Sequence, residues 1–373
     1  MKTPIPLAIV SLSFAPFASG KGVAGAPPHS SAFPGFASSW INGPLDVLDT
    51  GDSSRVEAGG DFSRGEVKVK SPTSQGKTKF KIDSLRVAPT TALPGAALRM
   101  GVVAERFWQK FEADSTFQDD GATKRSKDTY TSKFLNVAPQ IAWMPSAEVG
   151  LGVGYEHFQE TIDSTLVGEH KVELSRLALG GRWRSSLATL DFGFRNEAAT
   201  TKKLSKTTTV ASGGSTTVST SSVEESRYLP NETYVKATCD VDADLAWGMM
   251  LKFFDYNRKK EESSYRHVKL QATDRLGLAL QATYMPRGMV SIQGILRHEA
   301  AVDVARPARG LIANDGVEVN AVLRPADAWE VGAQVGYATG HTKWKLENPE
   351  DGPSGPTLDL ARHNVGLWAA ARF

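Results

Sequence analysis

Seven histidines and one cysteine are the residues of this 373-residue chain with the widest range of possible chemistry. No two histidines stand at the spacing of metal ligands in a helix or turn, and the lone Cys239 can form neither an internal disulfide nor a multi-cysteine metal site. His157 follows Glu156 and His298 precedes Glu299, but neighbours on a strand point to opposite faces, so neither forms an acid–base pair. We therefore expect a protein that is not an enzyme, with no catalytic residues, no metal and no cofactor.

Nucleotides and nucleic acids are not expected partners. Gly150, Gly152 and Gly154 superficially match a nucleotide-binding loop, but such a loop needs a following helix to offer its amide groups to phosphate. Strand spacing explains these glycines better. The 43 Lys and Arg residues against 41 Asp and Glu give a net charge of +2, so no global basic field exists to attract nucleic acid.

The elements that must position any functional side chain are strands, because hydrophobicity recurs with period two along most of the chain after residue 55. In 148–156, valine, leucine and tyrosine alternate with glycine and glutamate, and 276–284 and 330–337 repeat the pattern. A soluble β-sandwich would show the same alternation, so the connections between strands must decide between the two architectures.

Short and long connections take turns along the chain, as in an up-and-down membrane β-barrel with tight turns at one end and extended loops at the other. The short links are 145–147, 185–187, 240–244, 286–288 and 325–328. The long polar excursions are 114–129, 199–227, 258–264, 299–315 and 339–356. The excursion 199–227 has low complexity, and we expect a solvated surface spacer there.

The alternation predicts an all-β fold, a transmembrane antiparallel up-and-down β-barrel of about fourteen strands, with twelve and sixteen as alternatives. The expected strands are 55–70, 77–88, 97–113, 130–143, 148–161, 171–183, 188–197, 228–239, 245–257, 265–284, 289–298, 316–324, 329–338 and 360–373. An even number returns the chain to the side of the membrane on which the barrel began.

The segment before the barrel divides into two parts. Residues 1–20 have a lysine, an apolar stretch and then small residues, which is typical of a secretory signal peptide cleaved after Gly20, with a cut after Ala26 as the alternative. Residues 21–54 form either a plug inside the barrel or a disordered leader, and 55–373 form the barrel itself.

Large aromatic residues follow the strand ends, where girdles at the membrane surfaces would place them. The expected periplasmic girdle is Trp143, Trp183, Trp247, Tyr284 and Trp329. The expected outer girdle is Trp108, Phe111, Phe158, Tyr228, Tyr256, Tyr265 and Tyr337. The final Phe373, on an alternating strand, resembles the C-terminal insertion signal of bacterial outer-membrane barrels.

If the apolar face of each strand meets lipid, the other face lines the lumen. The candidate lumen-lining residues are Arg99, Glu105, Glu148, Glu156, Arg195, Lys252, Gln281, Gln293, Arg297, Glu318, Asn320, Arg324, Glu330, Gln334, Asn364 and Trp368. They either pair across a filled interior or line a pore. The many inward glycines leave room for water, a plug or a ligand. An apolar ligand path, or contact with a plug, would explain the inward apolar residues Val103, Met250, Ile295 and Trp368.

The segment 137–152 has the pattern of a strand, a turn with proline and a second strand in which glycine alternates. The segments 276–292 and 321–337 repeat this pattern. It resembles the long-chain fatty-acid transporter family of outer-membrane proteins. The resemblance implies a plugged barrel that passes hydrophobic molecules toward a lateral opening in its wall. The leader lacks the Asn-Pro-Ala signature usual in that family, and no ligand-binding residue is carried over.

Together these patterns predict a protein of the bacterial outer membrane that lets small solutes pass, with hydrophobic molecules as the class that the resemblance implies. The alternative is a non-conducting structural or surface-recognition barrel that acts through its extracellular loops. The expected partners are outer-membrane lipid and lipopolysaccharide, the barrel-insertion machinery acting on the C-terminal strand, and a small-molecule solute.

Overall fold

The computed structural model describes residues 48, 54–70, 74–93, 97–119, 122–146, 148–164, 168–185, 188–212, 215–229, 231–241, 244–255, 275–284, 289–301, 310–326, 328–344 and 357–373. The first eight strands are β1 (Arg55–Lys70), β2 (Ser74–Ala92), β3 (Leu98–Asp119), β4 (Ala122–Trp143), β5 (Val149–Ser164), β6 (Gly168–Arg184), β7 (Ala188–Arg195) and β8 (Ala198–Ser212). The other eight are β9 (Ser215–Leu229), β10 (Asn231–Asp240), β11 (Leu245–Asp255), β12 (Arg275–Tyr284), β13 (Val290–Ala301), β14 (Gly310–Ala326), β15 (Trp329–Trp344) and β16 (Thr357–Arg372).

Fourteen of these strands form one closed antiparallel barrel, as the alternation predicted. Neighbours in the chain are neighbours in the sheet, except that β7 pairs directly with β10. The barrel closes between β1 and β16, whose register runs from Arg55 opposite Arg372 to Lys70 opposite Thr357. The Phe373 N–H extends this ladder by donating to the Ser54 carbonyl at 2.9 Å. Closure leaves no free sheet edge, so the backbone polar groups of the wall are paired within it.

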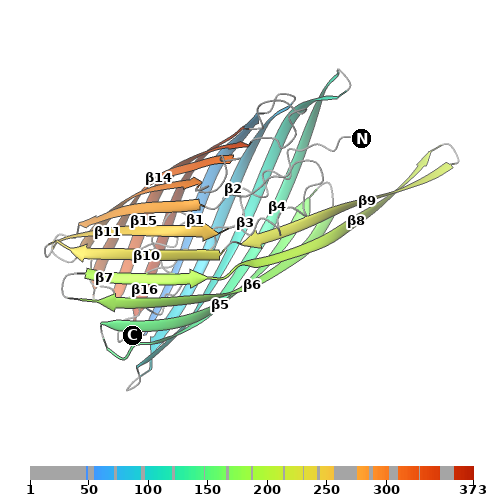
Figure 1. Cartoon of the computed structure of the whole chain (residues 1–373). Coiled ribbons are helices and arrows are strands. Elements are labelled where there is room, and N and C mark those ends of the chain that lie inside the picture. The colour runs from blue at the N-terminus through green and yellow to red at the C-terminus, as the bar shows by residue number, and fades with distance from the viewer. Residues whose placement is uncertain are drawn as a thin grey trace.

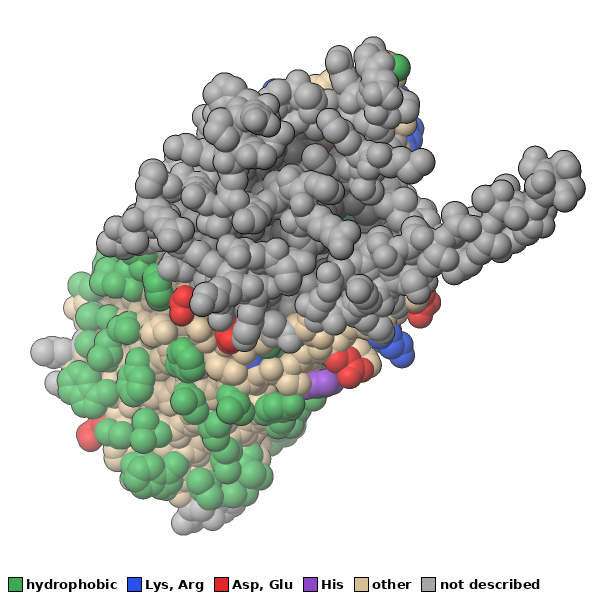
Figure 2. Space-filling view, turned by 45° about the vertical axis from the view of Figure 1, so that its right-hand side comes forward, with side chains coloured by type: hydrophobic (Ala, Val, Ile, Leu, Met, Phe, Trp, Pro, Cys, Tyr) green, Lys and Arg blue, Asp and Glu red, His purple; other side chains and the backbone are tan. Residues whose placement is uncertain are grey.

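Hydrophobic side chains cover the lower part of the outer wall (Figure 2). We call the outward hydrophobic residues on the part of the strands nearest the short turns the apolar belt. On β5, the outward residues Val149, Leu151, Val153 and Tyr155 are between 37% and 48% exposed. On β4 the belt runs from Leu135 to Trp143, eight residue steps or roughly 27 Å along the strand. A barrel tilt of about 40° makes this about 20 Å of height, comparable with the apolar band of membrane barrels.

Above the belt, the outward face of the same strands changes to charged and polar residues. With increasing distance from the short turns, Arg64 comes after Phe62 on β1 and His157 comes after Tyr155 on β5. On β4, Lys133 lies farther from the short turns than Leu135. Here both faces of a strand meet polar surroundings, because the interior also carries polar groups. The period-two signal therefore weakens, although the strands continue.

Two expected loops are in fact strands, and the expectation for them was wrong. The excursion 114–129 is the far end of the β3–β4 hairpin, whose pairing continues to Asp119 opposite Ala122. The excursion 199–227 lies within the hairpin β8–β9, which pairs only with itself and projects well beyond the barrel (Figure 1). Both segments are rich in polar residues, so their sequence shows no apolar alternation, and cross-strand backbone pairing extends them instead.

The five candidate periplasmic girdle residues lie at strand ends beside short turns, and each is between 49% and 54% exposed. Antiparallel pairing places these ends on one rim, together with the C-terminus of the chain (Figure 1). The outer girdle is only partly as expected. Trp108 and Tyr337 face outward, but Phe111 and Phe158 are 4% and 2% exposed, because both share the inward parity of their strands. The side chains of Tyr228, Tyr256 and Tyr265 lie outside the described residues.

The expected signal peptide, residues 1–20, lies outside the described residues, as does the leader apart from Leu48 and Ser54. Among the described residues, no helix is long and apolar enough to cross a membrane.

Candidate functional site

The interior of the barrel holds most of the candidate lumen residues. Glu105, Glu156, Arg195, Lys252, Gln281, Gln293, Glu318, Asn320, Glu330, Gln334, Asn364 and Trp368 are all 5% exposed or less. Arg99, Arg297 and Arg324 are partly exposed. Glu148 is exposed and does not belong with this set, because it lies in the turn before β5 begins at Val149.

The first charged group, the Glu156 cluster, joins five strands of the inner wall. Glu156 accepts from Arg176 Nε at 2.6 Å and from Arg195 Nε at 3.0 Å. Arg195 Nη1 reaches Glu232 Oε1 at 2.8 Å, and Lys252 Nζ lies 2.8 Å from the same oxygen. Three cations therefore share two carboxylates, all within the barrel. A buried charge is tolerated only when paired in this way, so the cluster fixes the positions of its members.

A second charged group, the Glu330 cluster, lies at the short-turn end. Glu330 accepts from Arg55 at 2.9 Å, from Arg324 at 3.1 Å and from Arg372 at 2.8 Å. Arg55 also pairs with Glu57 at 3.3 Å. Because these residues come from β1, β14, β15 and β16, the cluster ties together the seam at which the barrel closes.

Neutral polar groups join neighbouring strands on the β1 and β12–β16 side of the lumen. Asn364 donates to Asp61 at 3.1 Å, and Asn320 donates to Gln293 at 3.0 Å. Gln293 in turn donates to Thr283 Oγ1 at 3.2 Å. This wall is thus held by hydrogen bonds between side chains of adjacent strands.

Some inward polar groups have no partner among the described residues. The side-chain nitrogen and oxygen atoms of Asn136, Gln281 and Gln334 are buried and make no hydrogen bond there. Leaving a buried polar group unsatisfied costs about 1–3 kcal/mol. These three amides, on three separate parts of the wall, therefore require water or a solute as a partner, which favours a wet interior over a sealed one.

Apolar side chains are set among the polar ones on the same inner face. Tyr234, Met250, Ala279 and Ile295 pack together on β10–β13 and are at most 3% exposed. We call this group the Met250 patch. It adjoins the Glu156 cluster, because Tyr234 lies opposite Lys252 in the β10–β11 ladder.

A second apolar group, the Phe134 patch, lies further from the short turns on β3–β5. The Phe107 and Phe134 rings are 5.6 Å apart edge to face, and Phe134 and Phe158 are 5.5 Å apart. The Arg176 guanidinium lies 5.5 Å over the Phe158 ring. Ala198, at the base of the β8–β9 hairpin, packs on this patch. Aromatic rings thus pack beside paired charge on the inner wall, and the rings of Phe134 and Phe158 are buried.

Three of the inward glycines, Gly248, Gly332 and Gly336, do not leave empty space. An added Cβ at Gly332 would collide with the Trp368 indole, one at Gly248 with Gln281, and one at Gly336 with Asn364. Side chains of the neighbouring strand lie across each glycine. These glycines therefore let larger inward side chains lie flat along the wall.

Leu48, from the leader, lies against the inner wall near the short turns. It is 4% exposed and packs on Ala142 and Ala178, and its carbonyl accepts from Arg182 Nη1 at 2.7 Å. A Cβ at Gly150 would meet its Cδ2 atom. Arg182 is held in turn by Asp191, with Nε–Oδ1 at 2.6 Å. The wall therefore has a built contact for at least this residue of the leader.

The sequence reasoning missed several residues of the interior. Arg176, Glu232 and Arg362 were not among the candidates, although each is buried and paired. The signal was available for Arg176, because it alternates with the outward Leu177 and Leu179. Among the described residues, no group of three His, Cys, Asp or Glu side chains forms a potential metal site.

No family model and no curated protein matches the chain. Solved structures do. The chain is similar to the Pseudomonas putida toluene transporter TodX, with 9% identity over 95% of this chain and all of that one, at a TM-score of 0.61. It is similar to the Ralstonia pickettii toluene transporter TbuX, with 9% identity over 95% and 99% of the two chains, at 0.62. A Pseudomonas aeruginosa FadL homologue matches with 11% identity over 95% and 97%, at 0.60. These likenesses show that the chain has the barrel fold of those structures.

Proposed function

We propose that the chain is a barrel of the bacterial outer membrane through which small hydrophobic molecules pass. The apolar belt supports the membrane setting, because a continuous outward hydrophobic surface of this extent is unfavourable in water and favourable against acyl chains. Outer-membrane lipid is then the partner of the belt. We expect the barrel-insertion machinery to engage β16, the strand that closes the barrel on β1.

The observation that carries the choice of solute is the presence of the Met250 and Phe134 patches inside a barrel whose remaining inner wall is polar. A channel for ions or sugars gains nothing from inward methionine, isoleucine and phenylalanine. An apolar solute gains roughly 25 cal/mol for each Å² of its surface that leaves water, so it would move between such patches.

Passage needs no covalent chemistry and follows the concentration gradient. The charged clusters give the lumen no strong preference for either sign, because their cations and carboxylates are paired. Their role is to hold the strands that carry the apolar patches. TodX and TbuX are described as toluene transporters, and toluene belongs to the class of solute proposed here.

We also propose that residues 21–54 plug the barrel. The support is Leu48, whose side chain and carbonyl both have partners on the inner wall near the short turns. A plug anchored at this point would leave the solute a route through the side of the barrel or past the plug, and not an open pore.

Met249 and Met250 provide a matched test of the solute path. They are neighbours on β11, but Met249 is 47% exposed in the belt and Met250 is 2% exposed in the patch. We expect the chain to raise the initial rate of radiolabelled toluene uptake by a Gram-negative host that lacks its own hydrocarbon channels. Met250→Gln should reduce that increment about fivefold, from a loss of about 1 kcal/mol of apolar contact.

Met249→Gln, at equal surface abundance, should leave the uptake increment unchanged. If the wild-type chain gives no increment, the proposed passage is wrong. If the two glutamine variants behave alike, passage occurs but the Met250 patch is not on its route.

A second candidate function is surface recognition through the β8–β9 hairpin. The observation that favours it is the hairpin itself, two 15-residue strands that pair outside the barrel sheet and project beyond it (Figure 1). Passage does not require such an extension. Recognition by a phage or host surface would depend on it.

A further inference from the structure

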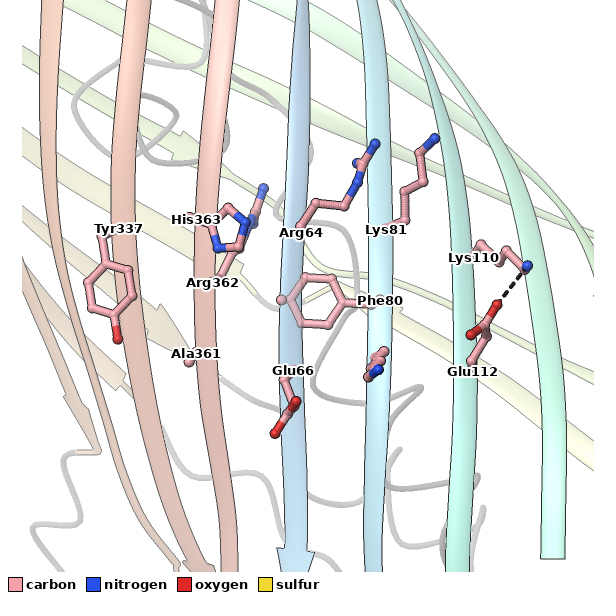
Figure 3. A pocket seen from close by; sticks show the side chains of 12 residues that line it. Arg64, Glu66, Phe80, Lys81, Lys110, Glu112, Tyr337, Ala361, Arg362 and His363 are labelled. Carbon is pink, nitrogen blue, oxygen red and sulfur yellow. Dashed lines mark ion pairs between the residues drawn. The ribbon is translucent and has the colours of Figure 1, made fainter.

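A pocket of about 510 Å³ opens on the outer wall across β15, β16, β1, β2 and β3 (Figure 3). Its lining includes Gly65 and Phe80, which both hold inward positions of their strands. Phe80, directly opposite Gly65 in the β1–β2 ladder, lays its ring over that position, and an added Cβ there would also strike the Ala361 carbonyl. Phe80 is 3% exposed and gives the pocket an apolar floor.

The side of the pocket nearest the apolar belt is a basic row. His363, Arg64, Lys81 and Lys110 form one row across the strands, because each is the register partner of the next on β16, β1, β2 and β3. Strand spacing makes this row about 14 Å wide. Figure 3 shows the Arg64 and Lys81 side chains extending in the same direction.

The charge of the pocket is positive. Arg64 and Lys81 share one carboxylate, Asp83, at 2.7 and 3.1 Å, so one positive charge of the two remains uncompensated. The outward part of the lining contains four Lys and Arg residues against two Glu residues, a difference of +2 before Asp83 is counted, whereas the fifth cation, Arg362, faces the lumen. Lys110 pairs with Glu112 at 2.7 Å on the solvent side of the pocket.

The pocket lies at the edge of the apolar belt. The outward residues one step below the basic row are Val365 and Phe62, which are 49% and 51% exposed and directly opposite each other. The surface therefore changes from apolar to cationic within two residues of β1 and β16. In the membrane setting of the proposed function, on which this inference rests, that step is the headgroup level of the outer leaflet.

We propose that this pocket binds a phosphorylated glycolipid of the lipid A class. Its phosphates would lie along the basic row, where Arg64 offers the bidentate geometry that suits phosphate. An acyl chain would descend over Phe62 and Val365. A small inorganic anion would use only the first of these surfaces, and a zwitterionic phospholipid would bring no net charge to the row.

The test is native mass spectrometry of the full chain in detergent, with bisphosphorylated lipid A, phosphatidylethanolamine or inorganic phosphate added. The wild-type chain should retain lipid A in preference to the other two. Arg64→Gln with Lys81→Gln should weaken lipid A binding at least about tenfold, since both substitutions remove a charged donor of hydrogen bonds to phosphate. The matched control is Arg125→Gln with Lys171→Gln, two exposed cations outside the pocket lining, which should leave binding unchanged.

Equal losses in the two double variants would overturn the proposal, because binding would then depend on overall charge. Equal retention of phosphatidylethanolamine, or equally tight inorganic phosphate, would overturn it as well. Toluene uptake separates this inference from the proposed function. A chain that admits toluene but holds no lipid A retains the function and loses the pocket's assignment, whereas a chain that admits none contradicts the function directly.

Discussion

Met249 and Met250 occupy adjacent positions on β11, and the wall of the barrel gives them opposite surroundings. The outward face places hydrophobic side chains where a soluble protein would place charges. The inward face encloses carboxylates and guanidinium groups where a soluble protein would pack its core. Alternation in a sequence therefore identifies two faces of a strand but not which of them is inside. The two faces should respond oppositely to the same kind of substitution.

The largest effect is expected inside, from Glu156→Ala. The substitution leaves Arg176 and Arg195 without the carboxylate that both contact, and an uncompensated buried charge typically costs 3–5 kcal/mol. We expect a loss of about 3 kcal/mol or more in the free energy of unfolding, measured by urea titration in lipid vesicles. Glu173→Ala, on the exposed face of β6, should change it by less than about 0.5 kcal/mol.

A compensating variant sharpens this result. Adding Arg176→Met to Glu156→Ala removes a cation that forms its ion pair with Glu156, and Arg195 keeps its ion pair with Glu232. Part of the lost stability should return. A double variant no more stable than Glu156→Ala would mean that packing, and not unpaired charge, caused the loss.

The next largest effect is expected outside, from Leu179→Arg in the middle of the belt. Leu179 is 51% exposed and faces the level at which lipid hydrocarbon is proposed. An arginine at the midplane of a membrane barrel costs about 2–4 kcal/mol. The same urea titration measures it, with Thr161→Arg above the belt as the control, expected to cost less than about 1 kcal/mol. Equal costs at both positions would contradict the membrane placement of the belt.

The belt explains which parts of the fold could be predicted from the sequence. Where one face carries the apolar belt, as at 149–155, alternation is strong, and the number of barrel strands was predicted correctly. Where both faces are polar, as at 114–129, no alternation remains, so the continuation of β3 and β4 was missed. Phe158 shows a different limit. Its aromatic character suggested a girdle, although its parity with Glu156 already placed it inward.

The ion pairs of the interior could not be predicted, because they depend on register. Glu156 meets Arg176 only because β5 and β6 pair with those two residues opposite each other. Arg195 meets Glu232 across the β7–β10 ladder, which skips two strands of the chain. Sequence alternation reports the face of a residue, and the neighbour across the ladder is set by hairpin length and by strands that leave the sheet.

A smaller effect is expected from shortening the β8–β9 hairpin. Replacing residues 203–224 with a two-residue turn removes strands that pair only with each other, and keeps the base that packs on the Phe134 patch. Barrel stability should change by less than about 0.5 kcal/mol, and toluene uptake should stay the same. A loss of phage or host binding with uptake unchanged would support the recognition role of the hairpin, and a loss of uptake would place the hairpin on the solute route.

The smallest effect is a pH dependence of amide hydrogen exchange, which we expect at the polar end of the wall and not in the belt. At the far end of the β3–β4 hairpin, Arg125 donates through Nε to Asp114 at 2.8 Å, and this hydrogen bond lowers the pKa of the Asp114 carboxyl from its ordinary value. A lowered folded-state pKa means that the pair stabilises the hairpin end above the ordinary aspartate pKa and is lost as pH falls through the lowered value. Amide hydrogen exchange there, corrected for intrinsic rates, should therefore quicken below about pH 4. Belt amides should not change, and Arg125→Gln should remove the pH step. A step of equal size in that variant would show that other carboxylates control the opening of this hairpin.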